Sequence, residues 1–434
     1  MDAKSRRWAA IVIGAVVACH LIVLLAAPRL VPITCDTPTF HAWVTMAHQR
    51  GLTAAYDWDS KEVAERFGAG TFNVNYPPLF FYLYYPLALP LFWLGVWPSC
   101  PSAAASAFFR APLCAVQLLL FLAIYRLLNR RGETSRAIWT GVLVGLNPLV
   151  LLVGPVFGQF EFVLLGLMVL SLELQSRRRF IPAGVLAALA ALVKPQFLLF
   201  VPIIALVAVR GRSWRDALRW LAPFLVSLAT LTSPFLLHSG LRCLQNGYAR
   251  VHEAHLPLTR EAFNAWWLVP AHYHLDSDSK IFLGATPKTI GFFALGVASL
   301  LLAACYLSGR ERSPLAGLLP IYLMSCFLLL SAMTNGAVIL GAVSLCIWGI
   351  SDRNVRAPAI LAAGLATLNV LSHVLLTATA KWHSWLAFPD PAAAARGVAI
   401  LQAAVYLGFL VYFVYTIIRP ATGGNRTVVG GEQR

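Results

Sequence analysis

The sequence predicts an all-α polytopic membrane protein with about 12 transmembrane helices. Of its 434 residues, 59% are hydrophobic and 12% are charged, whereas soluble domains carry about 25% charged residues. The mean hydropathy is +0.71. Apolar runs of roughly 15–23 residues lie between short charged islands and can cross a hydrocarbon core as helices. Helices are expected because each run must satisfy its own backbone hydrogen bonds in lipid.

The predicted transmembrane helices follow the apolar runs in chain order. They cover residues 8–28, 107–127, 137–154, 160–175, 180–194, 196–209, 217–237, 288–307, 314–331, 337–350, 357–379 and 398–418. Several middle runs are short, so we expect them to flank a water-filled cavity or a thinned region of the bilayer. The run at 79–97 is interpreted as a broken, re-entrant segment, because Pro86 and Pro90 interrupt a helix.

Basic connectors between the runs predict the orientation. They read "KSRR", "RLLNRRGETSR", "SRRR", "RGRSWRDALR", "GRER" and "DRNVR". Because Lys and Arg favour cytoplasmic loops, we expect these connectors and both termini on the cytoplasmic side. The net charge of +16 therefore reflects membrane orientation rather than nucleic-acid binding.

The chain divides into three expected parts. Residues 1–237 form a transmembrane module with a long first extracytoplasmic loop at 29–106. Residues 238–287 form a second extracytoplasmic loop, and residues 288–434 hold the last transmembrane helices and a cytoplasmic tail. Three of the eight cysteines fall on the outer side, where pairing in an oxidising compartment stays open: Cys35, Cys100 and Cys243.

Asp36 lies in the stretch "CDTPTFHAWV", just after the first apolar run. The residues that follow predict a helix with Pro38 in its first turn. Phe40 and Trp43 fall on one face and His41 on another, which indicates an amphipathic helix lying on the outer membrane surface. Asp36 is then either a helix cap or a carboxylate that takes a proton from an acceptor hydroxyl.

Two further charges lie within apolar sequence. Glu161, next to Gln159, is at the outer end of a run, and an acid near the hydrocarbon is a functional candidate. Lys194 stands between two short runs and either snorkels to outer headgroups or holds a phosphate, with Gln196 adding hydrogen bonds. The stretch "NYPPLFFYL", which includes Tyr76, is either an interfacial aromatic belt or part of the same site.

The second outer loop carries "YARVHEAHLPLTREAFNAWWLV". His252, Glu253 and His255 lack the i, i+4 histidine pair of helical zinc sites, and no third ligand is evident in the sequence. We therefore rank a surface or acceptor-contacting role above a metal site. Asn264 and Trp266 follow in the same loop.

Taken together, the order of these motifs resembles the GT-C glycosyltransferases over residues 8 to about 270. The nearest resemblance is to bacterial mannosyltransferases related to the second mannosyltransferase of GPI-anchor synthesis. The motifs are Asp36 with Phe40 and Trp43, Tyr76-Pro77-Pro78-Leu79, Gly158-Gln159-Phe160-Glu161, Lys194-Pro195-Gln196 and Asn264-Ala265-Trp266-Trp267.

The resemblance implies a GT-C-like fold and a hexosyltransferase, with mannose as the expected sugar. It implies a polyprenyl-phosphate sugar donor, a lipid-linked or cell-envelope glycan acceptor, and inversion on the extracytoplasmic face of the bacterial inner membrane. It implies no nucleotide-sugar domain, cofactor or metal. The expected site residues are catalytic Asp36 and Glu161, donor-phosphate-binding Lys194 and Gln196, and substrate-binding Tyr76, Gln159, His252, Asn264 and Trp266.

The chain departs from the family pattern at two places. Thr334 and Asn335 stand where relatives often carry a His-Glu pair at the outer mouth of a late span, and Glu161 stands where many bacterial relatives have Asp. Two other function classes therefore stay open. A sugar or lipid transporter could couple through Glu161 and Lys194, although no inverted repeat is detectable; a membrane scaffold without catalysis is the other.

Overall fold

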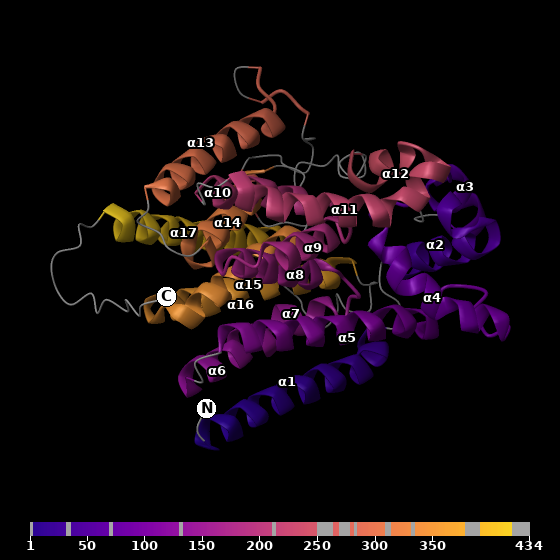
Figure 1. Cartoon of the computed structure of the whole chain (residues 1–434), viewed down its shortest axis with the longest axis horizontal. Coiled ribbons are helices and arrows are strands. Elements are labelled where there is room, and N and C mark those ends of the chain that lie inside the picture. The colour runs from indigo at the N-terminus through magenta and orange to yellow at the C-terminus, as the bar shows by residue number, and fades with distance from the viewer. Residues whose placement is uncertain are drawn as a thin grey trace.

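The computed structural model describes the chain in eleven stretches: residues 3–31, 36–68, 73–129, 133–210, 214–249, 264–268, 278–281, 284–308, 314–330, 335–377 and 391–418. In these stretches the regular elements are all helices (Figure 1). The predicted fold class, an all-α polytopic membrane protein, is confirmed.

Among the described residues, six helices contain a run long and apolar enough to cross a membrane. They are α1 (Ala3–Leu30), α5 (Ala103–Leu128), α11 (Trp214–Ser239), α13 (Pro287–Leu307), α16 (Arg353–Thr377) and α17 (Pro391–Ile418). Each overlaps a predicted run. The outward faces of these helices carry exposed leucines, isoleucines and phenylalanines, as expected for side chains that face lipid.

The remaining predicted runs fold into shorter helices packed inside the molecule. They are α6 (Thr134–Thr140) with the π-helical turn η2 (Gly141–Gly145), α7 (Pro148–Val153), α8 (Glu161–Ser176), α9 (Phe180–Ala191), η3 (Pro195–Phe200) with α10 (Val201–Arg210), η8 (Pro314–Leu318) with α14 (Leu319–Leu329), and α15 (Asn335–Ser351). Helix α8 is buried almost throughout and packs against α5, α9 and α15.

The first outer segment and the start of the second gather at one end of the molecule. Their elements are α2 (Thr37–Arg50), η1 (Leu52–Tyr56), α3 (Ser60–Phe67), α4 (Leu79–Trp93), α12 (Arg242–Leu244) and η4 (Gln245–Ala249). In Figure 1 they lie on the right, whereas α1 begins and α17 ends on the left. The long first loop therefore lies at the end of the molecule opposite to the start of α1 and the end of α17 (Figure 1).

Helix α2 differs from the prediction of a surface-lying amphipathic helix. Residues on both of its faces are buried, and only its last turn is exposed. Phe40 packs on Phe80 with ring centroids 4.9 Å apart, while on the other face His41 stacks on Trp97 at 5.3 Å. The prediction was wrong because the polar face meets neighbouring protein: Thr37 donates to Ser106 Oγ at 3.1 Å and His41 Nε2 donates to the Pro98 carbonyl at 2.8 Å.

Helix α4 runs without interruption through Pro86 and Pro90, so the expected break is wrong. Both prolines are exposed and lie one turn apart, where their rings disturb no packed neighbour. The helix ends at Trp93, and Gly95 then adopts a positive φ of 67° in a tight turn. At 15 residues, α4 spans roughly 22 Å, less than a hydrocarbon core of about 30 Å.

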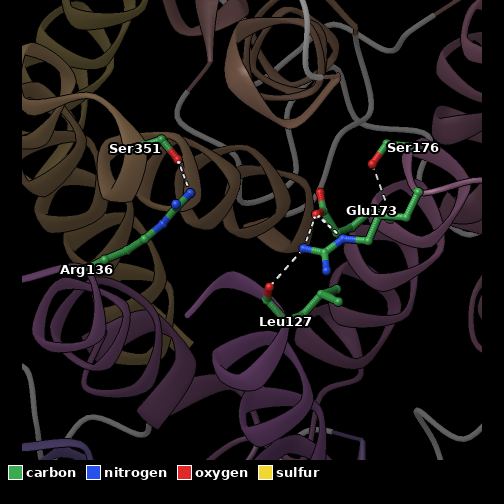
Figure 2. Close-up of polar contacts among 6 residues, drawn as sticks. Leu127, Arg136, Glu173, Ser176 and Ser351 are labelled. Carbon is green, nitrogen blue, oxygen red and sulfur yellow. Dashed lines mark hydrogen bonds and ion pairs between the residues drawn. The ribbon is translucent and has the colours of Figure 1, made fainter. Parts of the chain in front are cut away.

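Polar contacts at the other end of the bundle join its basic connectors to neighbouring helices (Figure 2). Arg177 caps the end of α8: it pairs with Glu173 at 2.6 Å and donates to the Leu127 carbonyl at 3.0 Å. Arg136 donates to Ser351 Oγ at 3.2 Å, which ties α6 to α15. These arginines therefore hold neighbouring helices together, in addition to any role in orienting the protein in the membrane.

Candidate functional site

Five polar side chains from four separate segments meet at the end of the bundle beneath α2. We call Asp36, Tyr76, Gln159, Glu161 and Lys194 the polar group. Gln159 bridges it: its Oε1 accepts from Lys194 Nζ at 3.0 Å, and its Nε2 donates to the Asp36 carboxylate. Lys194 Nζ lies 2.6 Å from Glu161 Oε1 and 5.1 Å from the centre of the Tyr76 ring.

The turn between α7 and α8 places Gln159 and Glu161. Gly158 has a φ of +68°, a conformation that glycine adopts without a steric penalty. The turn is closed by Gln159 N donating to the Val153 carbonyl at 2.8 Å. Glu161 is the first residue of α8, where the positive end of the helix dipole favours a carboxylate.

Lys194 owes its position to the proline that follows it. A residue before proline is driven out of the helical region, and Lys194 has extended dihedrals of φ −150° and ψ 149°. The chain therefore leaves α9 here, and the ammonium turns toward Glu161. Leu192 O just before it accepts from Leu79 N at 3.1 Å, so this connection is fixed to the start of α4.

Tyr76 is held through its backbone as well as its ring. Tyr56 Oη donates to the Tyr76 carbonyl at 2.7 Å. Burial raises the pKa of the Tyr76 phenol above its ordinary value, and the nearby Lys194 ammonium only partly opposes this effect. The phenol therefore stays protonated at neutral pH and can act as a hydrogen-bond donor.

The structure contradicts one alternative interpretation each of Asp36 and Lys194, and their catalytic and phosphate-binding roles stay predictions. Asp36 stands at the N-cap position of α2, but its side chain makes no capping hydrogen bond, so the cap interpretation is wrong. Lys194 is only 5% exposed and is paired with Glu161. A snorkelling lysine would keep its ammonium in the headgroup region, so that interpretation is also wrong.

Arg110 is a neighbour of the polar group that the sequence analysis missed. It lies on α5, is 1% exposed, and one guanidinium nitrogen donates to the Val31 carbonyl. A Cβ added to Gly158 would lie 3.9 Å from Arg110 Cγ, which places the arginine stem beside the Gln159 turn. One turn earlier on α5, Ser106 accepts from Thr37, the residue after Asp36.

The guanidinium of Arg110 is incompletely satisfied. Its Nε and Nη1 are buried and have no hydrogen-bond partner among the described residues. Leaving such donors unpaired is unfavourable by about 1–3 kcal/mol or more for a charged group. With Asp36 and Glu161 as acids and Lys194 as the other base, Arg110 brings the formal charge of these four side chains to zero. The sequence feature that could have identified Arg110 is an arginine inside an apolar run.

The other predicted site residues do not join the polar group. Gln196 lies in η3 with its Oε1 buried and without a partner in the described part of the chain. Asn264 Nδ2 donates to Leu330 O at 3.0 Å, and Trp266 Nε1 donates to Leu329 O at 2.9 Å. Both therefore attach the short helix η6 (Ala265–Leu268) to the end of α14.

Several predicted residues lie outside the part of the chain that the structure describes, or at its edge. His252, Glu253, His255, Thr334 and Cys35 lie outside the described residues, and Asn335 begins α15. Cys100 is exposed and Cys243 is buried, and neither forms a disulfide with another described cysteine.

Comparison with known proteins supports a glycosyltransferase. Residues 74–265 match the model of glycosyltransferase family 87. The matched segment contains Tyr76, Arg110, Gln159, Glu161 and Lys194, while Asp36 precedes it. No curated protein matches the chain. The site thus lies within a multi-pass membrane protein whose central part is similar to a glycosyltransferase family.

Proposed function

We propose that this chain is an integral-membrane glycosyltransferase. It transfers a hexose, with mannose as the expected sugar, from a polyprenyl-phosphate donor to a lipid-linked or cell-envelope glycan acceptor. The observation that carries the proposal is the Gln159 bridge, which holds a carboxylate, Asp36, and an ammonium, Lys194, in one hydrogen-bonded unit. Such a unit supplies the two charges that inverting transfer requires: a carboxylate to take the hydroxyl proton and a cation to stabilise the leaving phosphate.

The reaction forms one bond at the anomeric carbon and breaks another. The acceptor hydroxyl oxygen attacks that carbon, its proton passes to a carboxylate, and the bond to the phosphate oxygen breaks with the electron pair leaving on the phosphate. Inversion requires the base and the leaving group on opposite faces of the sugar ring. Positive charge on the phosphate side stabilises the transition state.

Asp36 is the better candidate for the base. Asp36 accepts a hydrogen bond from the neutral Gln159 amide, and it is less buried than Glu161, which is 4% exposed and paired with an ammonium. A carboxylate that an ammonium already holds is less free to turn toward an acceptor hydroxyl. Glu161 then orients Lys194, and it remains the alternative base.

The donor phosphate is assigned to Lys194 and Arg110. A lysine ammonium has three donors; Gln159 and Glu161 take two of them, and the third faces Tyr76, which a phosphate oxygen would displace. Arg110 offers Nε and Nη1, and a guanidinium binds phosphate oxygens in a two-point geometry. A bound phosphate would satisfy the buried donors that lack a partner.

The extracytoplasmic side is favoured by the direction of α8. Glu161 begins this helix and Arg177 follows its end, so the two residues lie roughly 24 Å apart along the axis. Arg177 belongs to a basic connector, and such connectors favour the cytoplasm. The polar group also lies at a helix end rather than mid-bundle, which argues against a transporter site near the bilayer midplane.

The deciding experiment is transfer by the purified full-length protein in proteoliposomes. Labelled polyprenyl-phosphate mannose and a membrane extract containing lipid-linked glycans are supplied, and labelled glycolipid product is measured over time. The expected result is product formation that Asp36→Asn abolishes. Movement of the labelled donor between leaflets without any transfer would favour a transporter and end the proposal.

A further inference from the structure

A polar cleft lies in the outer segments, beyond the polar group. It has a volume of about 430 Å³ and is lined by Tyr56, Asp57, Trp58, Asp59, Ser60, Asn73, Arg242, Gln245 and Asn246. Pockets that hold small organic molecules measure about 300–1,000 Å³. The two sides of the cleft come from the first and second outer segments, so the fold alone creates it.

The lining offers hydrogen-bond acceptors and donors close together. The Asp57 carboxylate is one-third exposed, and its ion pairs with described residues are long: 3.5 Å to His238 and 3.8 Å to Arg242. On the same wall Trp58 is 2% exposed, and its indole Nε1 has no hydrogen-bond partner within the described residues. An indole N–H that is buried normally finds a partner.

The walls of the cleft are fixed before any ligand binds. Asp59 caps α3 by accepting from Lys61 N at 2.5 Å, and Ser60 Oγ donates to Asn73 Oδ1 at 2.9 Å. Asn246 Nδ2 donates to the Tyr56 carbonyl at 3.1 Å. The conformational entropy lost on binding is therefore small, which favours a specific ligand over loose solvation.

The charge balance selects the class of ligand. The cleft presents two carboxylates, Asp57 and Asp59, against one lining cation, Arg242. A phosphate or another anion would meet two like charges, whereas a neutral polyol can use carboxylate acceptors, amide groups and an N–H donor together.

The cleft is separated from the polar group by one layer of side chains. Tyr56 lines the cleft and donates through its hydroxyl to the Tyr76 carbonyl, and the Tyr76 ring faces Lys194. A sugar in the cleft therefore cannot be the one that reacts. It would be a more distant unit of the same acceptor glycan.

We infer that this cleft binds a neutral hexose unit of the acceptor, away from the hydroxyl that is glycosylated. This inference rests on the proposed transferase function for its purpose, but the binding itself requires neither donor nor turnover. Asp57 and Trp58 would then recognise how long the acceptor glycan is, by binding this more distant hexose unit.

The test uses saturation-transfer NMR to measure direct binding of methyl α-mannoside and methyl α-glucoside to the full-length protein in nanodiscs. We expect at least one hexoside to bind, and Asp57→Asn and Trp58→Phe to weaken it by about tenfold, because each removes hydrogen-bonding capacity to a sugar hydroxyl. Glu65→Gln is the matched control, since Glu65 is an exposed carboxylate on α3 outside the lining.

Asp57 is partly exposed, so Asp57→Asn keeps the test valid if the tryptophan variant fails to fold. Absence of hexoside binding, equal binding by Asp57→Asn, or displacement by inorganic phosphate at lower concentration than by hexoside would each overturn the inference.

Transfer assays on the same variants separate this inference from the proposed function. We expect Asp57→Asn to raise the KM for acceptor glycan about tenfold with kcat nearly unchanged. If the wild type binds hexosides through Asp57 but transfers no sugar, the proposed function fails and the cleft assignment stands. If it transfers sugar and binds no hexoside, only the cleft assignment fails.

Discussion

At the level of single residues, the proposed chemistry depends most on Asp36 and Arg110. Asp36 accepts a hydrogen bond from a neutral amide and does not cap its helix. Arg110 keeps two donors without partners in the described part of the molecule. These two residues therefore give the sharpest tests of the proposed chemistry.

Replacing Asp36 with asparagine should leave the fold intact and nearly abolish sugar transfer. Asparagine keeps the shape of the side chain but cannot take a proton, and general-base catalysis contributes roughly 10²–10⁴-fold. Transfer rate and donor binding are measured in parallel, with Asp278→Asn as a control at an exposed outer carboxylate. Near-normal transfer by the folded Asp36→Asn protein would reject Asp36 as the base, and Glu161→Gln would then test the alternative.

Replacing Arg110 with glutamine should weaken donor binding by about tenfold or more, because a charge-assisted bond to phosphate is lost. Arg110→Lys should recover only part of the affinity, since an ammonium lacks the planar two-point geometry. Binding of polyprenyl-phosphate to the purified protein provides the measurement. Arg126→Gln on the exposed side of the same helix is the control, and equal affinity in Arg110→Gln and wild type would exclude the phosphate role.

At the scale of elements, two connections carry the site: the turn before α8 and the exit from α9. Their end residues, Glu161 and Lys194, form a buried ion pair at 2.6 Å. Removing one partner of a buried pair leaves an uncompensated charge, whereas removing both can be nearly neutral. The stability of these two connections is therefore coupled.

The variants Glu161→Gln and Lys194→Met should each lower the free energy of unfolding by about 3–5 kcal/mol. The double variant should recover most of that loss, yet remain inactive because the phosphate-side charge is gone. Thermal unfolding in detergent and the transfer assay give the two readouts. Additive destabilisation in the double variant would show that the two side chains do not depend on one another.

Helix α2 should make stability depend on pH through His41. The imidazole Nε2 donates to the Pro98 carbonyl at 2.8 Å, and burial lowers the pKa of His41 below 6.5. The unfolded chain then binds a proton more readily than the folded one, so this contribution to stability is present above about pH 6.5 and is lost as pH falls toward the folded pKa.

The measurement is the unfolding temperature of wild type and His41→Phe between pH 7.5 and pH 5.5. We expect a smaller decrease in the variant, because phenylalanine keeps the stack on Trp97 but does not titrate. Identical pH profiles would show that protonation of His41 does not limit stability.

At the scale of the whole molecule, the bundle separates basic connectors from the polar group. Cys100 is exposed at the end that holds α2 and α4, whereas Glu133 immediately precedes α6 at the other end. The orientation proposed for the site therefore has a direct chemical test.

In a background with all other cysteines replaced, Cys100 should react with an impermeant thiol reagent added outside intact cells. A cysteine at position 133, introduced as Glu133→Cys in a background that also lacks Cys100, should react only after permeabilisation. Labelling is read by mass shift on gels. The reverse pattern would place the site on the cytoplasmic side.

The sequence alone predicts the helical membrane class and the approximate positions of the apolar helices. Both depend on local properties, because lipid requires each apolar run to close its own hydrogen bonds. It also singled out Asp36, Gln159, Glu161 and Lys194, since charges and amides next to apolar runs are rare without a function. Lys194-Pro195 further determined an extended exit from α9.

How these residues contact one another depends on the tertiary structure. The pairing of Glu161 with Lys194, the Gln159 bridge and the neighbouring Arg110 join segments that are far apart in the chain, which local pattern does not encode. The prediction for α2 was wrong for the same reason. Helix α2 looked amphipathic because its polar face is visible in the sequence, while the neighbours that bury it come from α4 and α5. Packing partners at long sequence separation, rather than local propensity, determine burial and hence chemistry.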